Sequence, residues 1–210
     1  MVVRFFLDSN VIADYIIINL GINEEKQEIL REDLKEIEKY LKQQWKDIKQ
    51  HAIYSFLLLE LLRRKKHFTH HKFFTSLLAV SEVASVIYEK YCIDQMYERR
   101  IPFKYWFKPD FEIKIPQKIL ERIRLSIIKF HMLYISRKII QLAENIVIQE
   151  VTDIITNKKR DTHDAFLSAQ AVFNGCDFFV TNDGRLIRKM KKYKNIEYIR
   201  PERAYRVLCK

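Results

Sequence analysis

Short apolar runs rich in β-branched and aromatic residues alternate along this chain with longer helical segments. The runs VVRFFLD (2–8) and CDFFVTND (176–183) have the composition of buried strands, and both end in an aspartate. Further strands are expected at 73–75, 145–151 and 196–201. Because strands that alternate with helices are typical of βαβ units, the sequence predicts an α/β fold, with a central parallel sheet flanked by helices on both faces.

The segments between these runs have the spacing of helices. Segment 9–20 is expected to be a helix that Ser9 or Asn10 caps and Gly21 ends. Segment 24–50 repeats apolar residues every three or four positions, which predicts one amphipathic helix, and 52–62 is apolar nearly all round, which predicts a buried one. We also expect helices after the strand at 73–75 and at 116–144, 151–157, 162–175 and 186–191, with irregular structure over 92–112.

A single domain is expected over residues 1–210. A chain of 210 residues can bury one full core, and 48% hydrophobic content with only three Gly and four Pro favours a compact, helix-rich protein. The helical segments at about 24–66 and 92–144 are then long insertions in that domain. Three scattered cysteines suit neither a disulfide framework nor a zinc site. The chain shows neither a signal peptide nor a membrane span, so a cytoplasmic protein without a membrane partner is expected.

The chain is strongly basic, with 38 Lys and Arg against 27 Asp and Glu and a net charge of +11. Such an excess is consistent with a polyanionic partner such as nucleic acid. It is equally consistent with an ion-paired surface of the kind found in thermophilic proteins. Both interpretations stay open on composition alone.

Four acidic residues stand out against this basic background. Asp8 and Asp183 each follow an expected strand, so both should lie at the edge of the sheet where ligands bind in parallel α/β folds. Glu82 lies on an apolar helical stripe, and Asp164 lies on the partly apolar face of another helix. Both can point at the same edge. Each also has a structural interpretation: Asp8 as a helix cap, Glu82 and Asp164 in ion pairs, and Asp183 as a turn residue.

Carboxylates that converge without countercharge repel one another, and their burial raises their pKa values. A divalent cation reverses that penalty. Oxygen ligands suit Mg²⁺ or Mn²⁺, whereas zinc prefers His and Cys. The four acidic residues therefore indicate a candidate site for Mg²⁺ or Mn²⁺.

The segments FFLDSNVIADY, SLLAVSEVA, DTHDAFLSAQA and FFVTNDGRL resemble, in this order, the signature segments of the PIN-domain family. In this resemblance Asp8, Glu82, Asp164 and Asp183 match the four acidic residues of the family one by one. The resemblance implies a PIN-like, metal-dependent ribonuclease in which these four residues hold Mg²⁺ or Mn²⁺ and a metal-activated water hydrolyses the RNA phosphodiester. The long helical insertions exceed the minimal members of the family and leave the substrate class open.

The family includes toxins of toxin–antitoxin modules, RNA-processing enzymes and relatives of flap nucleases. An RNA substrate, a cognate antitoxin and a homodimer are therefore the partners that the resemblance implies. The alternatives are a catalytically silent, PIN-like RNA-binding scaffold and a structure-specific DNA nuclease.

Other residues are candidates for supporting roles around this site. Outer contacts to a metal-bound water or a ligand carboxylate are expected from Asn10, Asp161 and Thr181, and Asp161 can also cap its helix. The basic tail of the buried helix can complement the helix dipole or contact phosphate. The candidates for contacts to the nucleic-acid backbone are Arg185, Arg188, Lys189, Arg63, Arg64, Lys65 and Lys66.

Overall fold

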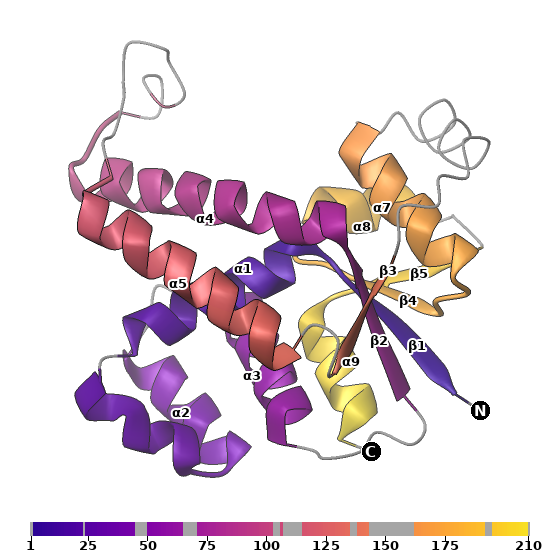
Figure 1. Ribbon diagram of the computed structural model, residues 1–210, viewed down its shortest axis with the longest axis horizontal. Coiled ribbons are helices and arrows are strands. Elements are labelled where there is room, and N and C mark those ends of the chain that lie inside the picture. Colours follow the sequence, from indigo (N-terminus) through magenta and orange to yellow (C-terminus); the bar gives the residue numbers. More distant parts are fainter. Residues whose placement is uncertain are drawn as a thin grey trace.

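The computed structural model describes residues 2–22, 24–44, 50–64, 71–102, 106, 115–134, 138–142, 162–191 and 195–209. Its strands form one five-stranded, all-parallel sheet in the order β3-β2-β1-β4-β5 (Figure 1). The strands are β1 (Val3–Leu7), β2 (His71–Ser76), β3 (Ile139–Leu142), β4 (Phe178–Val180) and β5 (Glu197–Ile199). The predicted α/β fold with a parallel sheet is therefore confirmed.

The centre of the sheet is held by aromatic residues on neighbouring strands. Phe5 of β1 stacks on Phe73 of β2 and on Phe178 of β4, with ring centroids 5.2 and 5.3 Å apart. On the opposite face Phe6 stacks on Phe179, with centroids 5.1 Å apart. Because side chains alternate between the faces of a strand, these stacks fix the register of β1 between its neighbours on both faces.

Each face of the sheet has its own apolar core. The core that contains Phe5 and Leu7 is built with α1 (Ser9–Gly21), α2 (Leu34–Gln44), α3 (Gln50–Arg64), α4 (Leu77–Glu98), α5 (Gln117–Tyr134) and α9 (Pro201–Leu208). The core that contains Phe6 is built mainly with α7 (Thr162–Phe173) and α8 (Gly184–Met190). Helices therefore cover both faces, and the carboxyl ends of the strands stay at one edge.

The segment predicted as one helix over 24–50 is instead two elements. A 3₁₀-helix, η1 (Glu24–Arg31), is followed by α2, which begins at Leu34. Asp33 lies between them, and its Oδ1 accepts hydrogen bonds from the backbone N–H groups of Lys35 and Glu36 at 2.8 and 3.0 Å. This is the geometry of a helix N-cap, so Asp33 starts a new helix inside an unbroken apolar pattern.

Three further boundaries differ from the sequence prediction. Segment 92–98 is helical rather than irregular, and α4 ends before Arg100, which has a positive φ of 53°. The helix expected to reach 144 ends at Tyr134, and 139–142 forms β3, which pairs with β2. The helix α9 was not predicted, although Pro201 stands in its first turn. The strand and helix expected at 145–157 lie outside the described residues.

The other predicted elements are confirmed, including the end of α7 near Gly175, which has a positive φ of 62°. The predicted cap of the first helix by Ser9 or Asn10 is wrong, because both residues lie inside α1 and Asp8 caps it. None of the described helices has the length and apolar content that a membrane crossing requires.

Candidate active site

Asp8 lies at the centre of the carboxyl edge of the sheet, directly after β1. It is 4% exposed and is the N-cap of α1, since its Oδ1 accepts a hydrogen bond from the Ser9 N–H at 2.8 Å. Its Oδ2 accepts from the Thr181 hydroxyl at 2.6 Å and from the Asn10 side-chain amide at 3.2 Å. Asp8 therefore both caps α1 and lies at the carboxyl edge of the sheet, so the two interpretations of this residue are compatible.

The burial of Asp8 has an electrostatic consequence. Removal of the carboxyl group from water raises its pKa, and the hydrogen bonds from Thr181, Asn10 and Ser9 oppose that rise without cancelling it. An ionised Asp8 is thus disfavoured by its surroundings, which is the condition that a nearby cation would relieve.

A cleft of about 380 Å³ opens beside Asp8. Glu82 of α4 and Asp164 of α7 line the same cleft, so three of the four predicted acidic residues border one space. His163 also lines it, and its Nδ1 lies 2.9 Å from Glu82 Oε1. Residues from three distant parts of the sequence therefore meet at this edge of the sheet.

Glu89 is a further acidic residue of the cleft that was not predicted from the sequence. It lies on α4, seven residues after Glu82, and therefore two helical turns farther along the same face. Ser85 and Val86 line the cleft between them. The seven-residue spacing of the two glutamates was visible in the sequence, but it gave no sign of which helix face meets α7.

Asp183 follows β4, as predicted, but it is not among the residues that line this cleft. It is the N-cap of α8, and its Oδ1 accepts hydrogen bonds from the N–H groups of Arg185 and Leu186 at 2.6 and 3.1 Å. Its connection to Asp8 runs through Thr181, whose Oγ1 accepts from the Asp183 N–H at 3.0 Å. A metal-holding role for Asp183 stays a prediction.

Asp14 forms a buried polar network near this edge that was also not predicted from the sequence. It is 6% exposed, forms an ion pair with Lys90 of α4, and accepts hydrogen bonds from Asn182 and from the Ser55 hydroxyl, the latter at 3.3 Å. Asn182 also donates to Ser55 Oγ at 2.8 Å. The loop after β4 is thus tied to α1, α3 and α4. Only the folded chain brings these four residues together.

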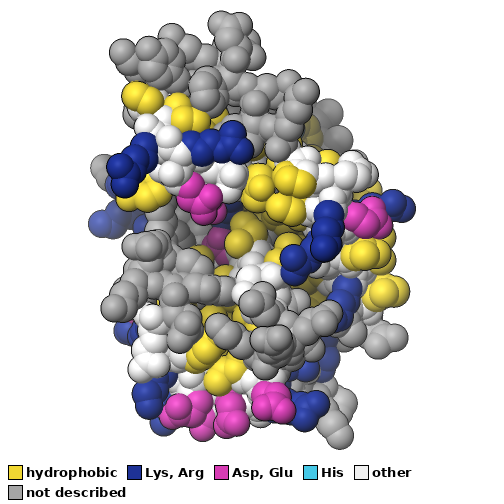
Figure 2. Space-filling model, turned by 90° about the vertical axis from the view of Figure 1, so that its left-hand side faces the viewer, with side chains coloured by type: hydrophobic (Ala, Val, Ile, Leu, Met, Phe, Trp, Pro, Cys, Tyr) yellow, Lys and Arg dark blue, Asp and Glu magenta, His cyan; other side chains and the backbone are white. Residues whose placement is uncertain are grey.

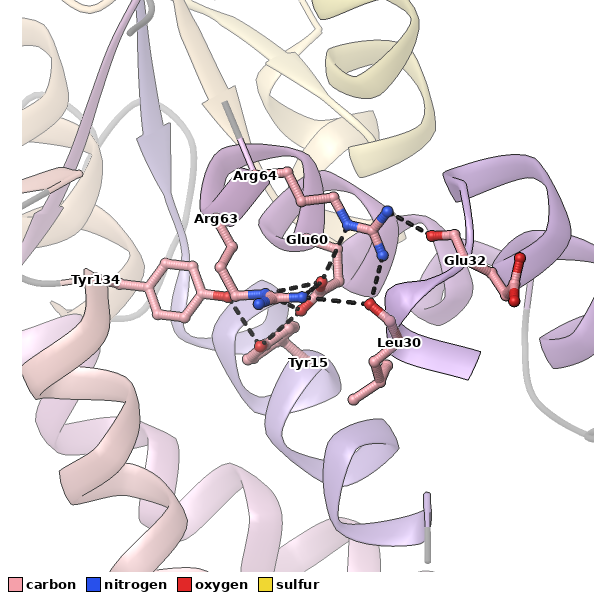
Figure 3. Close-up of polar contacts among 7 residues, drawn as sticks. All are labelled: Tyr15, Leu30, Glu32, Glu60, Arg63, Arg64 and Tyr134. Carbon is pink, nitrogen blue, oxygen red and sulfur yellow. Dashed lines mark hydrogen bonds and ion pairs between the residues drawn. The ribbon is translucent and has the colours of Figure 1, made fainter. Parts of the chain in front are cut away.

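The basic candidates fall into two groups. Arg185, Arg188 and Lys189 are exposed on α8, which starts at the carboxyl edge of the sheet. Arg63 and Arg64 are the last two residues of α3. Both arginines pair with the buried Glu60, at 2.7 and 3.6 Å (Figure 3). Lys65, Lys66 and Asp161 lie outside the described residues.

The lining of the cleft has the chemistry of a site for a hard cation. Among the described residues, the lining contains the carboxylates of Asp8, Glu82, Glu89 and Asp164 and no Lys or Arg. Across the described ranges, no three His, Cys, Asp or Glu side chains lie close enough to hold one ion. The donor types fit Mg²⁺ or Mn²⁺, and Asp8, Glu82 and Asp164 are the predicted ligands that border a common space.

Comparisons with protein-family models, curated proteins and solved structures found no match to this chain. The resemblance to the PIN-domain family therefore depends on the four sequence segments alone. The structure adds an α/β fold with a parallel sheet and no family assignment.

Proposed function

We propose that this protein is a PIN-like, Mg²⁺- or Mn²⁺-dependent ribonuclease. The observation that carries the proposal is the meeting of Asp8, Glu82 and Asp164 around one cleft at the carboxyl edge of the sheet. These residues come from a strand end and two helices that are far apart in the sequence. Packing alone does not require three acidic residues to share one cleft, and the burial of Asp8 opposes its ionisation.

In this proposal each residue has a defined task. Asp8, Glu82 and Asp164 would hold the cation once their side chains turn toward it across the cleft, since no three of the described acidic side chains lie close enough to share one ion in this structure. Asp183 is a fourth candidate ligand. Thr181 and Asn10 orient the Asp8 carboxylate through their hydrogen bonds to Oδ2. Arg185, Arg188 and Lys189 hold the RNA backbone beside the cleft. A bound divalent cation supplies a water of lowered pKa and neutralises charge on a phosphoryl oxygen.

The proposal is tested by cleavage assays on single-stranded RNA, tRNA and branched DNA, with Mn²⁺ or with EDTA. We expect Mn²⁺-dependent cleavage of RNA that falls by about 100-fold or more in Asp8→Asn and in Asp164→Asn. Glu121→Gln, an exposed change on α5, is the matched control and should retain full activity.

The alternatives give different outcomes in the same experiment. Cleavage of branched DNA in preference to RNA would indicate a structure-specific DNA nuclease. RNA binding without cleavage, together with no heat of Mn²⁺ binding, would indicate a silent scaffold. RNA cleavage unchanged by EDTA and by both Asp→Asn variants would refute the proposal.

A toxin of this kind would need a partner protein that covers the cleft. Co-purification of a small antitoxin that blocks Mn²⁺ binding would support the toxin branch of the proposal. The oligomeric state, for which a homodimer is the expectation, is measurable by analytical ultracentrifugation.

A further inference from the structure

A second cavity, of about 680 Å³, lies among α1, η1, α3 and α5. Its lining includes Tyr15 and Asn19, which are farther along α1 than the residues of the acidic cleft, Ser9 and Asn10. The side of the molecule that carries α5 and η1 is hollowed at mid-height, and acidic side chains border the hollow together with basic and apolar ones (Figure 2). The cavity and the acidic cleft have no described lining residue in common.

A chain of hydrogen bonds forms the inner wall of this cavity (Figure 3). The Tyr134 hydroxyl donates to the Tyr15 hydroxyl at 2.8 Å, and the Tyr15 hydroxyl donates to Glu60 Oε1 at 3.1 Å. Arg63 holds the same carboxylate, with Nε and Nη2 at 2.9 and 2.7 Å from Oε2. Glu60 itself is 2% exposed.

This chain fixes what the inner wall can offer to a ligand. A tyrosine hydroxyl has one proton, and both protons are used within the chain, so the two oxygens can only accept a further hydrogen bond. Burial raises the pKa of Tyr15 and of Tyr134, which keeps both hydroxyl groups protonated. The inner wall therefore suits a ligand group that donates hydrogen bonds, such as an alcohol.

The rim of the cavity has the opposite character. The described lining residues include four basic side chains, Arg31, Arg63, Arg64 and Lys129, and two acidic ones, Glu28 and Glu60, which leaves an excess of two positive charges among them. Within the described residues, Arg31 and Lys129 have no acidic partner and are exposed. The Nη1 group of Arg63 takes no part in its pair with Glu60. Arg64 is different, because it holds the backbone carbonyl groups of Leu30 and Glu32 and so builds the wall.

We propose that this cavity binds a small phosphate monoester whose organic part carries hydroxyl groups. A phosphate monoester has a charge of about −1.5 to −2 at neutral pH, which matches the excess positive charge of the rim. Its hydroxyl groups would donate to the oxygens of Tyr134 and Tyr15. The volume also lies within the roughly 300–1,000 Å³ of typical small-molecule sites, whereas a bare phosphate ion would fill little of it. Sugar phosphates and nucleoside monophosphates share this chemistry.

The test is isothermal titration of the full chain, in EDTA, with inorganic phosphate, ribose 5-phosphate and AMP. EDTA removes divalent ions, so the carboxylates of the acidic cleft repel all three probes. We expect saturable binding of ribose 5-phosphate that is tighter than that of inorganic phosphate. Tighter binding of AMP would assign the site to nucleotides, and equal or weaker binding of AMP would assign it to sugar phosphates.

Variants connect the binding to this cavity. Lys129→Ala and Arg31→Ala should each weaken ribose 5-phosphate binding by about tenfold, because each removes one charge-assisted contact. Lys118→Ala, an exposed change on the same helix as Lys129, is the matched control and should have no effect. Tyr134→Phe, checked for folding by circular dichroism, should weaken ribose 5-phosphate binding and leave phosphate binding unchanged.

Three results would overturn the proposal. They are the absence of saturable binding for every probe, equal affinity for inorganic phosphate and ribose 5-phosphate, and unchanged binding in both Lys129→Ala and Arg31→Ala. Asp8→Asn should bind the probes like the wild type. Failure of the ribonuclease proposal and failure of this one are therefore separate outcomes.

Discussion

The Thr181 hydroxyl group donates to Asp8 Oδ2 over 2.6 Å, and both side chains are almost fully buried. Thr181→Val keeps the shape of the side chain and removes this donor. We expect a loss of about 1–3 kcal/mol in the free energy of unfolding, because a buried carboxyl oxygen loses a strong partner. The pKa of Asp8 should rise further, because the Thr181 hydrogen bond lowers it. Urea denaturation and an NMR titration of Asp8 measure the two effects.

Thr75→Val is the matched control for this change. Thr75 is also fully buried, but its hydroxyl donates to a neutral acceptor, the Leu7 carbonyl oxygen, at 3.1 Å. We expect a loss of about 0.5–1.5 kcal/mol and no change in the pKa of Asp8. An Asp8 pKa that is the same in Thr181→Val and in the wild type would contradict the role given to Thr181.

The raised pKa of Asp8 also predicts how stability depends on pH. Between the ordinary value of 3.8 and the higher value in the folded state, the folded chain binds more protons than the unfolded chain. The free energy of unfolding of the metal-free protein should therefore fall as pH rises through this window, and then level off. Asp8→Asn removes this contribution, so its stability relative to the wild type should increase from pH 3.8 upward. Urea denaturation in EDTA at a series of pH values measures the difference.

Asp33 provides a control of opposite sign. Hydrogen bonds from the Glu36 and Lys35 backbone lower its pKa, so its contribution is present above the ordinary value and is lost as pH falls through the lower, folded value. Asp33→Asn should therefore lose stability relative to the wild type as pH rises through that window. The prediction for Asp8 fails if Asp8→Asn and the wild type show the same pH dependence.

For single residues, the sequence predicted the place in the fold better than the hydrogen-bond partners of the side chain. Asp8 was predictable because a strand end has a fixed place in a parallel sheet. Asn10 and Thr181 were expected to contact a metal-bound water or a ligand carboxylate, but the sequence did not indicate that this carboxylate is Asp8. Glu89 and Asp14 were not predictable, because their surroundings depend on which face of α4 meets α1 and α7, and no local pattern records that choice.

Among the helices, the buried Glu60 connects α1, α3 and η1. Its carboxylate pairs with Arg63 and Arg64 of α3 and accepts from Tyr15 of α1, while Arg64 holds the end of η1 through the Leu30 carbonyl group at 2.7 Å. Glu60→Gln leaves two guanidinium groups without their carboxylate. Removal of one partner from a buried pair costs about 3–5 kcal/mol, and partial exposure of both arginines should reduce this to about 2–4 kcal/mol.

The measurement is urea denaturation of Glu60→Gln beside Glu197→Gln. Glu197 pairs with Arg203 on the surface, where an ion pair contributes about 0–1 kcal/mol. Amide hydrogen exchange at residues 28–32 should also become faster in Glu60→Gln alone. Equal losses of stability in the two variants would show that Glu60 does not hold η1 and α3 together.

The elements themselves show where a periodic pattern stops being informative. One amphipathic repeat runs through 24–50, and it fits one helix or two, since the break depends on the cap made by Asp33. Segment 139–142 continues an apparent helix, but pairing of Ile139 and Ile140 with Phe73 and Phe74 makes it a strand. Tertiary pairing overrides local preference there. The order of the strands was not predictable either, because it is fixed by crossovers between distant segments.

The net charge of the whole molecule has a consequence for how the protein binds RNA. A chain with a net charge of +11 should bind RNA with an affinity that falls steeply with salt, because bound RNA releases counterions. If Arg185, Arg188 and Lys189 hold the backbone beside the cleft, replacing all three by Ala should reduce the slope of log K against log salt by about 2, at about 0.7 for each phosphate contact. Replacing Lys35, Lys72 and Lys118, which are exposed on α2, β2 and α5, removes the same charge elsewhere.

Fluorescence anisotropy with labelled RNA at several salt concentrations compares the two triple variants. Equal slopes would mean that the basic surface acts as a general field, whereas a reduced slope only in the α8 variant would place the RNA backbone beside the acidic cleft.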